Sequence, residues 1–217
     1  MPSDTRAITS GSLLASSMVL IGAETMSAPR SRATQSSRVP VANKPVRDYG
    51  LEAIAAAGIK EVGIVVSDPR ELLLPDHRTG ELITTLVNSQ AEIRAAVGDG
   101  SRYGLRVTYI EQEAPLGLAH AVKISEDFMA GDSFVMYLGD NLIKDGIVPF
   151  VREFEREKPE AQILLAKVAR PWEFGVAELE GERVVRLEEK PKQPRSDLAL
   201  VGVYLFTKTI FDAVRAI

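Results

Sequence analysis

Strand-like and helix-like segments alternate along most of this chain, and that alternation constrains the fold more than any other feature. Short apolar runs rich in branched residues predict buried strands, and amphipathic stretches between them predict helices. The expected strands are 62–66, 105–112, 134–138, 161–168, 198–206 and a hairpin of 175–179 with 184–188. The expected helices are 45–58, 90–97, 118–129, 148–157 and 208–217. This order predicts a three-layer α/β/α sandwich on a mixed, mostly parallel, Rossmann-like sheet.

The composition is typical of a globular protein and excludes several kinds of site. Of 217 residues, 45% are hydrophobic and 26% are charged, and the net charge is −4. An acidic chain has no overall attraction for nucleic acid or an anionic membrane, so neither partner is expected. The chain has no cysteine and only two histidines, which excludes thiolate chemistry and argues against a multi-histidine metal centre. No apolar stretch approaches the roughly 20 residues of a membrane helix, and we expect a cytoplasmic protein.

Two segments depart from the alternation. Residues 1–38 contain nine serines and only two acids, Asp4 and Glu24, so they are interpreted as an atypical leader. The same segment contains an apolar run from Met18 to Gly22, which predicts a first strand placed centrally in the sheet. Residues 70–89 do not continue the rhythm and predict an inserted loop.

A glycine and an aspartate follow the apolar strand 134–138 directly. In an open α/β sheet, ligands bind just beyond the carboxyl ends of the strands. Asp140 there, with Gly139 allowing close approach of backbone, suits Mg²⁺ held between protein and phosphate oxygens. An Asp140–Asn141 turn that only ends the strand explains the same residues. Both interpretations stay open at this point.

Two further strand ends carry polar groups. Gln112 offers a donor and an acceptor, as needed to contact the edge of a pyrimidine base, and Gly117 would let a base lie against backbone. Lys190 can meet a phosphate, and Glu189 can accept hydrogen bonds from sugar hydroxyls. Taken singly, these residues equally fit an ordinary turn and an exposed charge pair. His120 is interpreted as a structural or surface histidine.

Taken in order, these segments resemble the sugar nucleotidyltransferase family. The blocks are VPVANKPV (39–46), GDGSRYG (98–104), Gln112 with PLGLA (115–119), LGDN (138–141), FGV (174–176), EEKP (188–191) and VGVY (201–204). They are most similar to glucose-1-phosphate thymidylyltransferases of the longer prokaryotic form. The resemblance covers about residues 39–69 and 90–217. It implies that residues 39–217 form an incomplete domain of this family, with an insertion at about 70–89.

The resemblance implies an activity and a role for each site residue. The family joins a nucleoside triphosphate, here expected to be dTTP, to glucose 1-phosphate and releases pyrophosphate. Asp140 would hold Mg²⁺, Gln112 and Gly117 would contact the base, and Lys190 would meet the sugar phosphate. Gly175, Glu189 and the backbone near Leu200 would contact the sugar. Asp140 and Lys190 are thus the expected catalytic residues, and such enzymes commonly assemble as homo-oligomers.

The N-terminal part departs from the family pattern. The family has a glycine-rich loop carrying an arginine, followed by a lysine, whose amides and charges stabilise phosphate. Here Glu24 stands in the matching loop and Ser36 in place of the lysine, although Arg30, Arg32 or Arg38 could substitute. The family's second metal-binding aspartate lies beyond Ile217, so the chain resembles the middle of such an enzyme.

Two functions therefore follow from the sequence. One is an active nucleotidyltransferase that makes dTDP-glucose. The alternative is a catalytically impaired or truncated relative that only binds nucleotide sugar. A glycosyltransferase is disfavoured, because its Asp-x-Asp metal motif has no match at Asp140-Asn141-Leu142.

Overall fold

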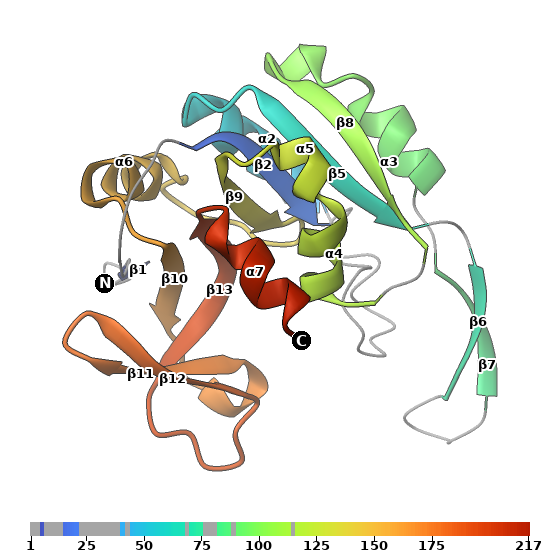
Figure 1. Ribbon diagram of the computed structural model, residues 1–217. Coiled ribbons are helices and arrows are strands. Elements are labelled where there is room, and N and C mark those ends of the chain that lie inside the picture. The colour runs from blue at the N-terminus through green and yellow to red at the C-terminus, as the bar shows by residue number, and fades with distance from the viewer. Residues whose placement is uncertain are drawn as a thin grey trace.

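The computed structural model describes residues 5–6, 15–21, 40–41, 44–67, 70–75, 82–87, 90–113 and 116–217. Within these ranges, a nine-stranded sheet carries helices on both faces (Figure 1). Its strands are β1 Thr5–Arg6, β2 Ala15–Ile21, β5 Glu61–Ser67, β8 Arg106–Gln112, β9 Ser133–Leu138, β10 Ala161–Lys167, β11 Gly175–Glu180, β12 Arg183–Glu189 and β13 Leu198–Phe206. The α-helices are α2 Val46–Ala56, α3 Gln90–Val97, α4 Leu118–Ile124, α5 Glu126–Met129, α6 Val148–Glu157 and α7 Thr209–Arg215. The predicted three-layer α/β/α fold with a mixed sheet is confirmed. Among the described strands, however, three pairings in this sheet are parallel and five are antiparallel, because β13 lies antiparallel to β9, β10 and β11, so the sheet is not mostly parallel.

The sheet places the ends of its parallel strands at one edge. The main order is β1-β10-β13-β9-β2-β5-β8, and β9, β2, β5 and β8 run parallel. Ile21 lies opposite both Leu138 and Val65, so β2 fills the central position that the Met18–Gly22 run predicted. Ser67 lies opposite Gln112. Because β13 runs antiparallel to β9, its first residues reach the same edge.

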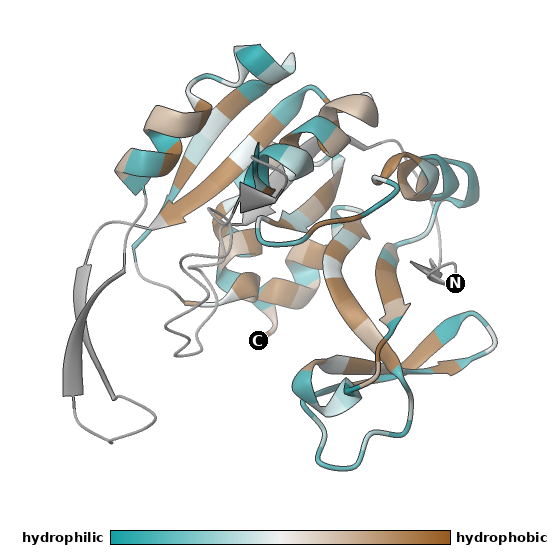
Figure 2. Cartoon of the chain, turned by 180° about the vertical axis from the view of Figure 1, so that it is seen from behind, coloured by the Kyte–Doolittle hydropathy of each residue, from teal (hydrophilic) through white to brown (hydrophobic). Residues whose placement is uncertain are grey.

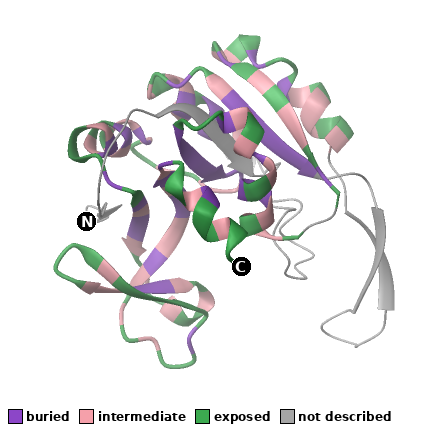
Figure 3. Cartoon of the chain, viewed as in Figure 1, coloured by how far each residue is buried: buried purple, intermediate pink, exposed green. Residues whose placement is uncertain are grey.

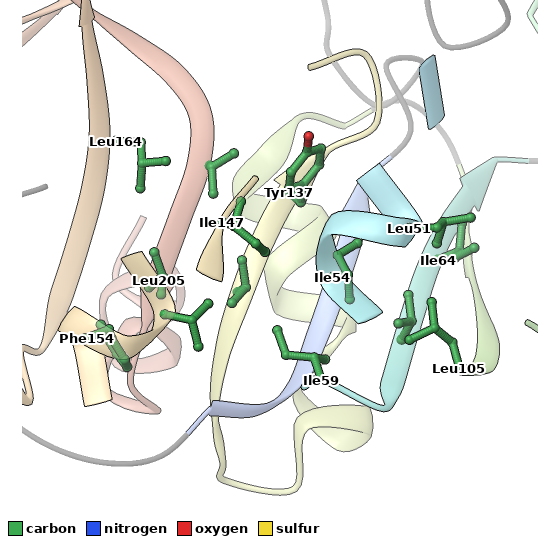
Figure 4. Close-up of a cluster of buried hydrophobic side chains, with 14 of the residues drawn as sticks. Leu51, Ile54, Ile59, Ile64, Leu105, Tyr137, Ile147, Phe154, Leu164 and Leu205 are labelled. Atoms are coloured by element: carbon green, nitrogen blue, oxygen red, sulfur yellow. The ribbon is translucent and has the colours of Figure 1, made fainter. Parts of the chain in front are cut away.

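Two apolar clusters hold the helical layers to the sheet. The cluster on one face joins α2, α3 and α6 to the strands, through residues such as Leu51, Val97 and Phe154. Figure 4 shows part of this cluster, with Leu51 and Phe154 labelled. The cluster on the other face joins α4, α5 and α7, through Ala121 and Phe211 among others. All six residues of β9 are buried, because helices cover both its faces (Figure 3). Hydrophobic residues accordingly follow the strands, and hydrophilic residues gather on the outer helices (Figure 2).

One predicted helix is interrupted. Residues 118–129 form two helices, α4 and α5, that meet at Ser125. The buried Ser125 hydroxyl donates to the Ala121 carbonyl at 2.7 Å. Such bonding to the preceding turn competes with the regular helix ladder and bends the chain. The expectation of a single helix is therefore wrong.

The expectation of a loop at 70–89 is also corrected. β6 Arg70–Pro75 pairs antiparallel with β7 Leu82–Val87. The aliphatic and β-branched residues of both segments favour extended backbone. A second small pair joins β3 Pro40–Val41 to β4 Lys44–Pro45. In the described residues, no helix has the length and apolar character to cross a membrane.

Candidate active site at the carboxyl edge of the sheet

Gln112 is a buried amide at the end of β8. Its side chain is 1% exposed, and Nε2 lies 3.4 Å from the carbonyl oxygen of Gly117 and 2.9 Å from Nδ1 of His120. Oε1 of Gln112 has no hydrogen-bond partner among the described residues. A buried acceptor left unpaired costs about 1–3 kcal/mol, so this atom is suited to receive a donor from a ligand. The predicted base-contacting residue thus has an acceptor to offer.

Gly117 forms the start of α4 beside this amide. Its backbone has φ 89° and ψ 178°, a conformation essentially restricted to glycine. Nothing described lies within 4 Å of a Cβ built on it. The residue therefore turns the chain sharply into the helix and leaves one side of the backbone open. This open backbone is what the sequence predicted for a surface on which a base could lie.

Asp140 sits in the turn directly after β9, and Asn141 holds that turn. Nδ2 of Asn141 lies 3.3 Å from Oδ1 of Asp140 and 3.4 Å from the Leu138 carbonyl. The Tyr137 hydroxyl donates to the Asn141 carbonyl at 3.0 Å. Burial raises the pKa of Tyr137 to about 12, and the negative charge of Asp140 adds to the rise. The aspartate is therefore positioned by a turn whose backbone is tied to the core.

The three predicted sugar-contacting residues come together across three strands. A Cβ atom at Gly175 would lie 3.0 Å from Oε2 of Glu189 and 3.4 Å from Cδ1 of Leu200. Gly175 opens β11 and pairs with Glu189 at the end of β12, while Leu200 lies in β13. Burial raises the pKa of Tyr204 to about 12, with a smaller contribution from the charge of Glu189. The Glu189 carboxylate thus lies beside Gly175 and close to β13.

Lys190 follows Glu189 in a left-handed backbone conformation. Its φ is 46°, and its backbone N–H donates to the Phe174 carbonyl at 3.0 Å. Nζ lies 3.2 Å from Oε1 of Glu189, in an exposed pair worth under about 1 kcal/mol. Since that pair is weak, the ammonium group remains available to an anionic ligand. The hairpin backbone therefore sets the position of Lys190.

Contacts along the edge connect these groups into one surface. Gly202 of β13 packs against Asn141, and Leu200 lies two residues before it. This links the Asp140 turn to the Gly175–Glu189–Leu200 cluster. The end of β8, with Gln112, is three strand positions from β9, or roughly 14 Å. An extended nucleotide sugar can bridge that distance along one sheet edge.

Three contributors were not identified from the sequence. His120 contacts the Gln112 amide, Asn141 contacts Asp140, and Gly202 lets β13 pass beside Asn141. Of these three contacts, the sequence indicated only that of Asn141, because this residue directly follows Asp140. The substituted phosphate-loop positions Glu24 and Ser36, and the arginines at 30, 32 and 38, lie outside the described residues.

A separate hollow lies away from these residues. It has a volume of about 450 Å³ and is lined by Asp48, Glu52, Ala55, Arg102 and Tyr103. Arg102 Nη2 lies 3.3 Å from Oδ2 of Asp48, so ion pairing joins α2 to the 101–103 turn. None of these residues belongs to the candidate site.

The metal-ligating side chains at the carboxyl edge of the sheet determine which metal ion could bind there. In the described residues, no group of three or more His, Asp or Glu side chains could enclose a metal ion. Mg²⁺ usually binds through one or two carboxylates together with substrate phosphates and water. A single carboxylate, such as Asp140, fits that mode.

Comparison with known families decides the relationship. The model of the nucleotidyl transferase family matches residues 22–216. The chain belongs to this family. Glucose-1-phosphate thymidylyltransferase of Streptomyces griseus is 51% identical over 197 residues, which cover 90% of this chain and 50% of that enzyme. The chain thus spans about half the length of the Streptomyces relatives that it matches.

Solved structures share the fold. A crystal structure assigned as a glucose-1-phosphate thymidylyltransferase of Bacillus anthracis, in complex with a sucrose, matches with a TM-score of 0.74 and 27% identity. The match covers 92% of this chain and 74% of that one. UDP-glucose pyrophosphorylase complexed with UDP-glucose matches with a TM-score of 0.67 over 93% of this chain and 80% of that one. At 19% identity, the second likeness shows the fold alone.

Proposed function

We propose that the chain forms the nucleotide-binding and sugar-binding domain of a glucose-1-phosphate thymidylyltransferase. An oxygen of the glucose 1-phosphate group attacks the α-phosphorus of dTTP. The α–β phosphoanhydride bond breaks, so that dTDP-glucose and pyrophosphate form. The observation that carries the proposal is the unpaired buried acceptor of Gln112 on the same sheet edge as Asp140 and the Gly175–Glu189–Leu200 cluster.

Each group has a task in this reaction. Gln112 would bind the base edge over Gly117, while Glu189 and the open face of Gly175 would bind glucose hydroxyls. Lys190 would bind the sugar phosphate and hold the attacking oxygen in line, because catalysis of phosphoryl transfer depends mainly on position and charge. Asp140 would hold Mg²⁺, which neutralises phosphate charge when it is bound. We infer a cytoplasmic enzyme that assembles as a homo-oligomer.

Pyrophosphate release tests the proposal directly. The chain is incubated with dTTP, glucose 1-phosphate and Mg²⁺, and pyrophosphate is measured by a coupled assay. Asp140→Asn is expected to lower the rate by about 10²–10³, the cost of losing one stabilising group. The matched control is Asp145→Asn, an exposed aspartate in the loop that follows, which should leave the rate unchanged.

Glu24 and Ser36 favour the second function, a relative that binds nucleotide sugar without turnover. Isothermal titration with dTDP-glucose separates the two. Binding with no pyrophosphate release from any triphosphate supports the binding-only relative, and turnover at ordinary enzyme rates excludes it.

A further inference from the structure

We propose that His120 fixes the orientation of the Gln112 amide and thereby makes the site selective for bases that carry an N3–H donor. This inference rests on the proposed function and adds a residue that acts through Gln112. His120 is a positioning residue, because its contact is with the amide and not with the base.

The backbone of Gly117 gives the amide a first, long hydrogen bond at the start of α4. Nε2 of Gln112 lies 3.4 Å from the Gly117 carbonyl oxygen, which also accepts a bond from the Ala121 N–H at 3.2 Å. A carbonyl oxygen can only accept hydrogen bonds, whereas an amide NH₂ can only donate them. The Gly117 carbonyl therefore favours the side-chain nitrogen of Gln112 over its oxygen at the helix start, but the bond is long.

This orientation determines the tautomer of His120. Nδ1 lies 2.9 Å from the same Nε2, within hydrogen-bond range. Because Nε2 is a donor, Nδ1 must be the unprotonated acceptor, and the ring proton must lie on the other nitrogen. One turn of α4 thus offers the amide two acceptors, one from the backbone and one from the imidazole.

The opposite end of the amide is then committed to accepting. Oε1 is buried and lacks a partner among the described residues, and a ligand donor would remove that penalty. Thymine and uracil carry a hydrogen on N3, whereas cytosine has a lone pair there, which would face the lone pairs of Oε1. The His120 contact therefore favours the first two bases and disfavours cytosine.

Removing the imidazole acceptor should relax this selection. The amide would keep only the long bond to Gly117, so it could rotate and present NH₂ to a cytosine ring. Two variants separate the acceptor from the shape of the side chain. In His120→Asn, the side-chain Oδ1 can take the place of Nδ1 and accept the hydrogen bond from Nε2 of Gln112. In His120→Leu, a methyl group lies in a similar position but cannot accept a hydrogen bond.

Nucleotide binding tests the proposal. Dissociation constants for dTTP, dUTP and dCTP are measured by isothermal titration on the wild-type chain and both variants. His120→Leu is expected to weaken dTTP and dUTP binding about tenfold, the worth of one neutral hydrogen bond, and to narrow the preference over dCTP by a similar factor. His120→Asn should stay within about threefold of the wild type. The role of His120 would be overturned if the wild type and His120→Leu preferred dTTP over dCTP by the same factor. It would also be overturned if both variants lost the same affinity for dTTP. Neither result would contradict the proposed function. Absence of dTTP binding by the wild-type chain would overturn both the role of His120 and the proposed function.

The tautomer provides a measurement that needs no variant at position 120. The chain has two histidines, so ¹⁵N-labelled imidazole signals can be assigned with a His77→Asn variant. The His120 ring should show an unprotonated Nδ1 and a protonated Nε2 at neutral pH. A proton on Nδ1 would overturn the inference even if His120→Leu fails to fold.

Discussion

A Cβ atom at position 202 would overlap the side-chain amide nitrogen of Asn141 and approach Cδ1 of Leu138 to 2.8 Å. Gly202 also has φ +67°, a backbone conformation that side chains rarely adopt. Position 202 must therefore be glycine for β13 to pass beside the Asp140 turn. The amide that glycine accommodates is the one that contacts Oδ1 of Asp140.

Gly202→Ala should disturb both the stability of the protein and the proposed metal site at Asp140. Left-handed strain and overlap together should lower the free energy of unfolding by roughly 2–4 kcal/mol. Displacement of Asn141 should also weaken Mg²⁺-dependent nucleotide binding. Urea unfolding and titration with dTTP and Mg²⁺ measure the two effects.

Gly181→Ala is the matched control for that variant. Gly181 has φ +63° in the β11–β12 turn, and no described atom lies within 4 Å of a Cβ built on it. The Gly181→Ala variant has the left-handed strain without the overlap. Its free energy of unfolding should therefore fall by about 1 kcal/mol, and its nucleotide binding should be unchanged. Similar losses in both variants would show that the contact with Asn141 is unimportant.

Glu189→Gln should weaken sugar binding selectively. A charged acceptor binds hydroxyl groups more strongly than a neutral amide does, so the KM for glucose 1-phosphate should rise about tenfold. Glu188→Gln is the control, because this neighbour is also exposed but pairs with Arg186 at 3.0 Å. Steady-state kinetics with varied glucose 1-phosphate distinguish the two carboxylates. An equal rise in KM would contradict the assignment of Glu189.

Alkaline pH should destabilise the protein through its buried tyrosines. The pKa values of Tyr137 and Tyr204 are both raised to about 12, first by burial. A phenol with a folded pKa above the unfolded value of about 10 contributes stability below pH 10 and loses it as pH rises through 12. Each contribution is at most about 2–3 kcal/mol.

Tyr204→Phe isolates one of these contributions. The free energy of unfolding, measured in urea between pH 9 and pH 12, should fall less steeply in this variant than in the wild type. Tyr137→Phe is less clean, because it also removes the bond to the Asn141 carbonyl. Equal slopes in the wild type and Tyr204→Phe would show that Tyr204 ionises as freely in the folded protein as in the unfolded chain.

The fold was predictable where local pattern and packing agree. The helices at 90–97 and 148–157 and the strand at 198–206 have the bounds that the sequence predicted. The break at Ser125 was not predictable from apolar periodicity, because a hydroxyl bond to Ala121 decides it. The hairpin at 70–87 was obscured by Pro75 and the polar run after it, which favour a loop.

The candidate site was predictable as a set of strand ends, but its internal contacts were not. Gln112 and Glu189 both end strands, and the rule that ligands collect there is independent of the detailed packing. The contact between His120 and Gln112 depends on how α4 leaves Gly117, which sequence spacing does not encode. Gly202 was visible only as part of the VGVY block (201–204), and its role depends on β13 lying beside Asn141.

Lys190 should show a conflict between stability and function. Its left-handed backbone costs about 1–2 kcal/mol in a non-glycine residue, and the greater freedom of glycine when unfolded offsets about half of that. Lys190→Gly should therefore raise the free energy of unfolding by roughly 0.5–1 kcal/mol. The same variant should lower kcat/KM for glucose 1-phosphate by about 10²–10³, because the phosphate loses its cation. Lys158→Gly is the matched control: Lys158 has φ 55° at the end of α6 and should gain the same stability without loss of activity. Urea unfolding and kinetics on both variants separate backbone strain from charge, and a loss of stability in Lys190→Gly alone would mean that the lysine side chain supports the hairpin.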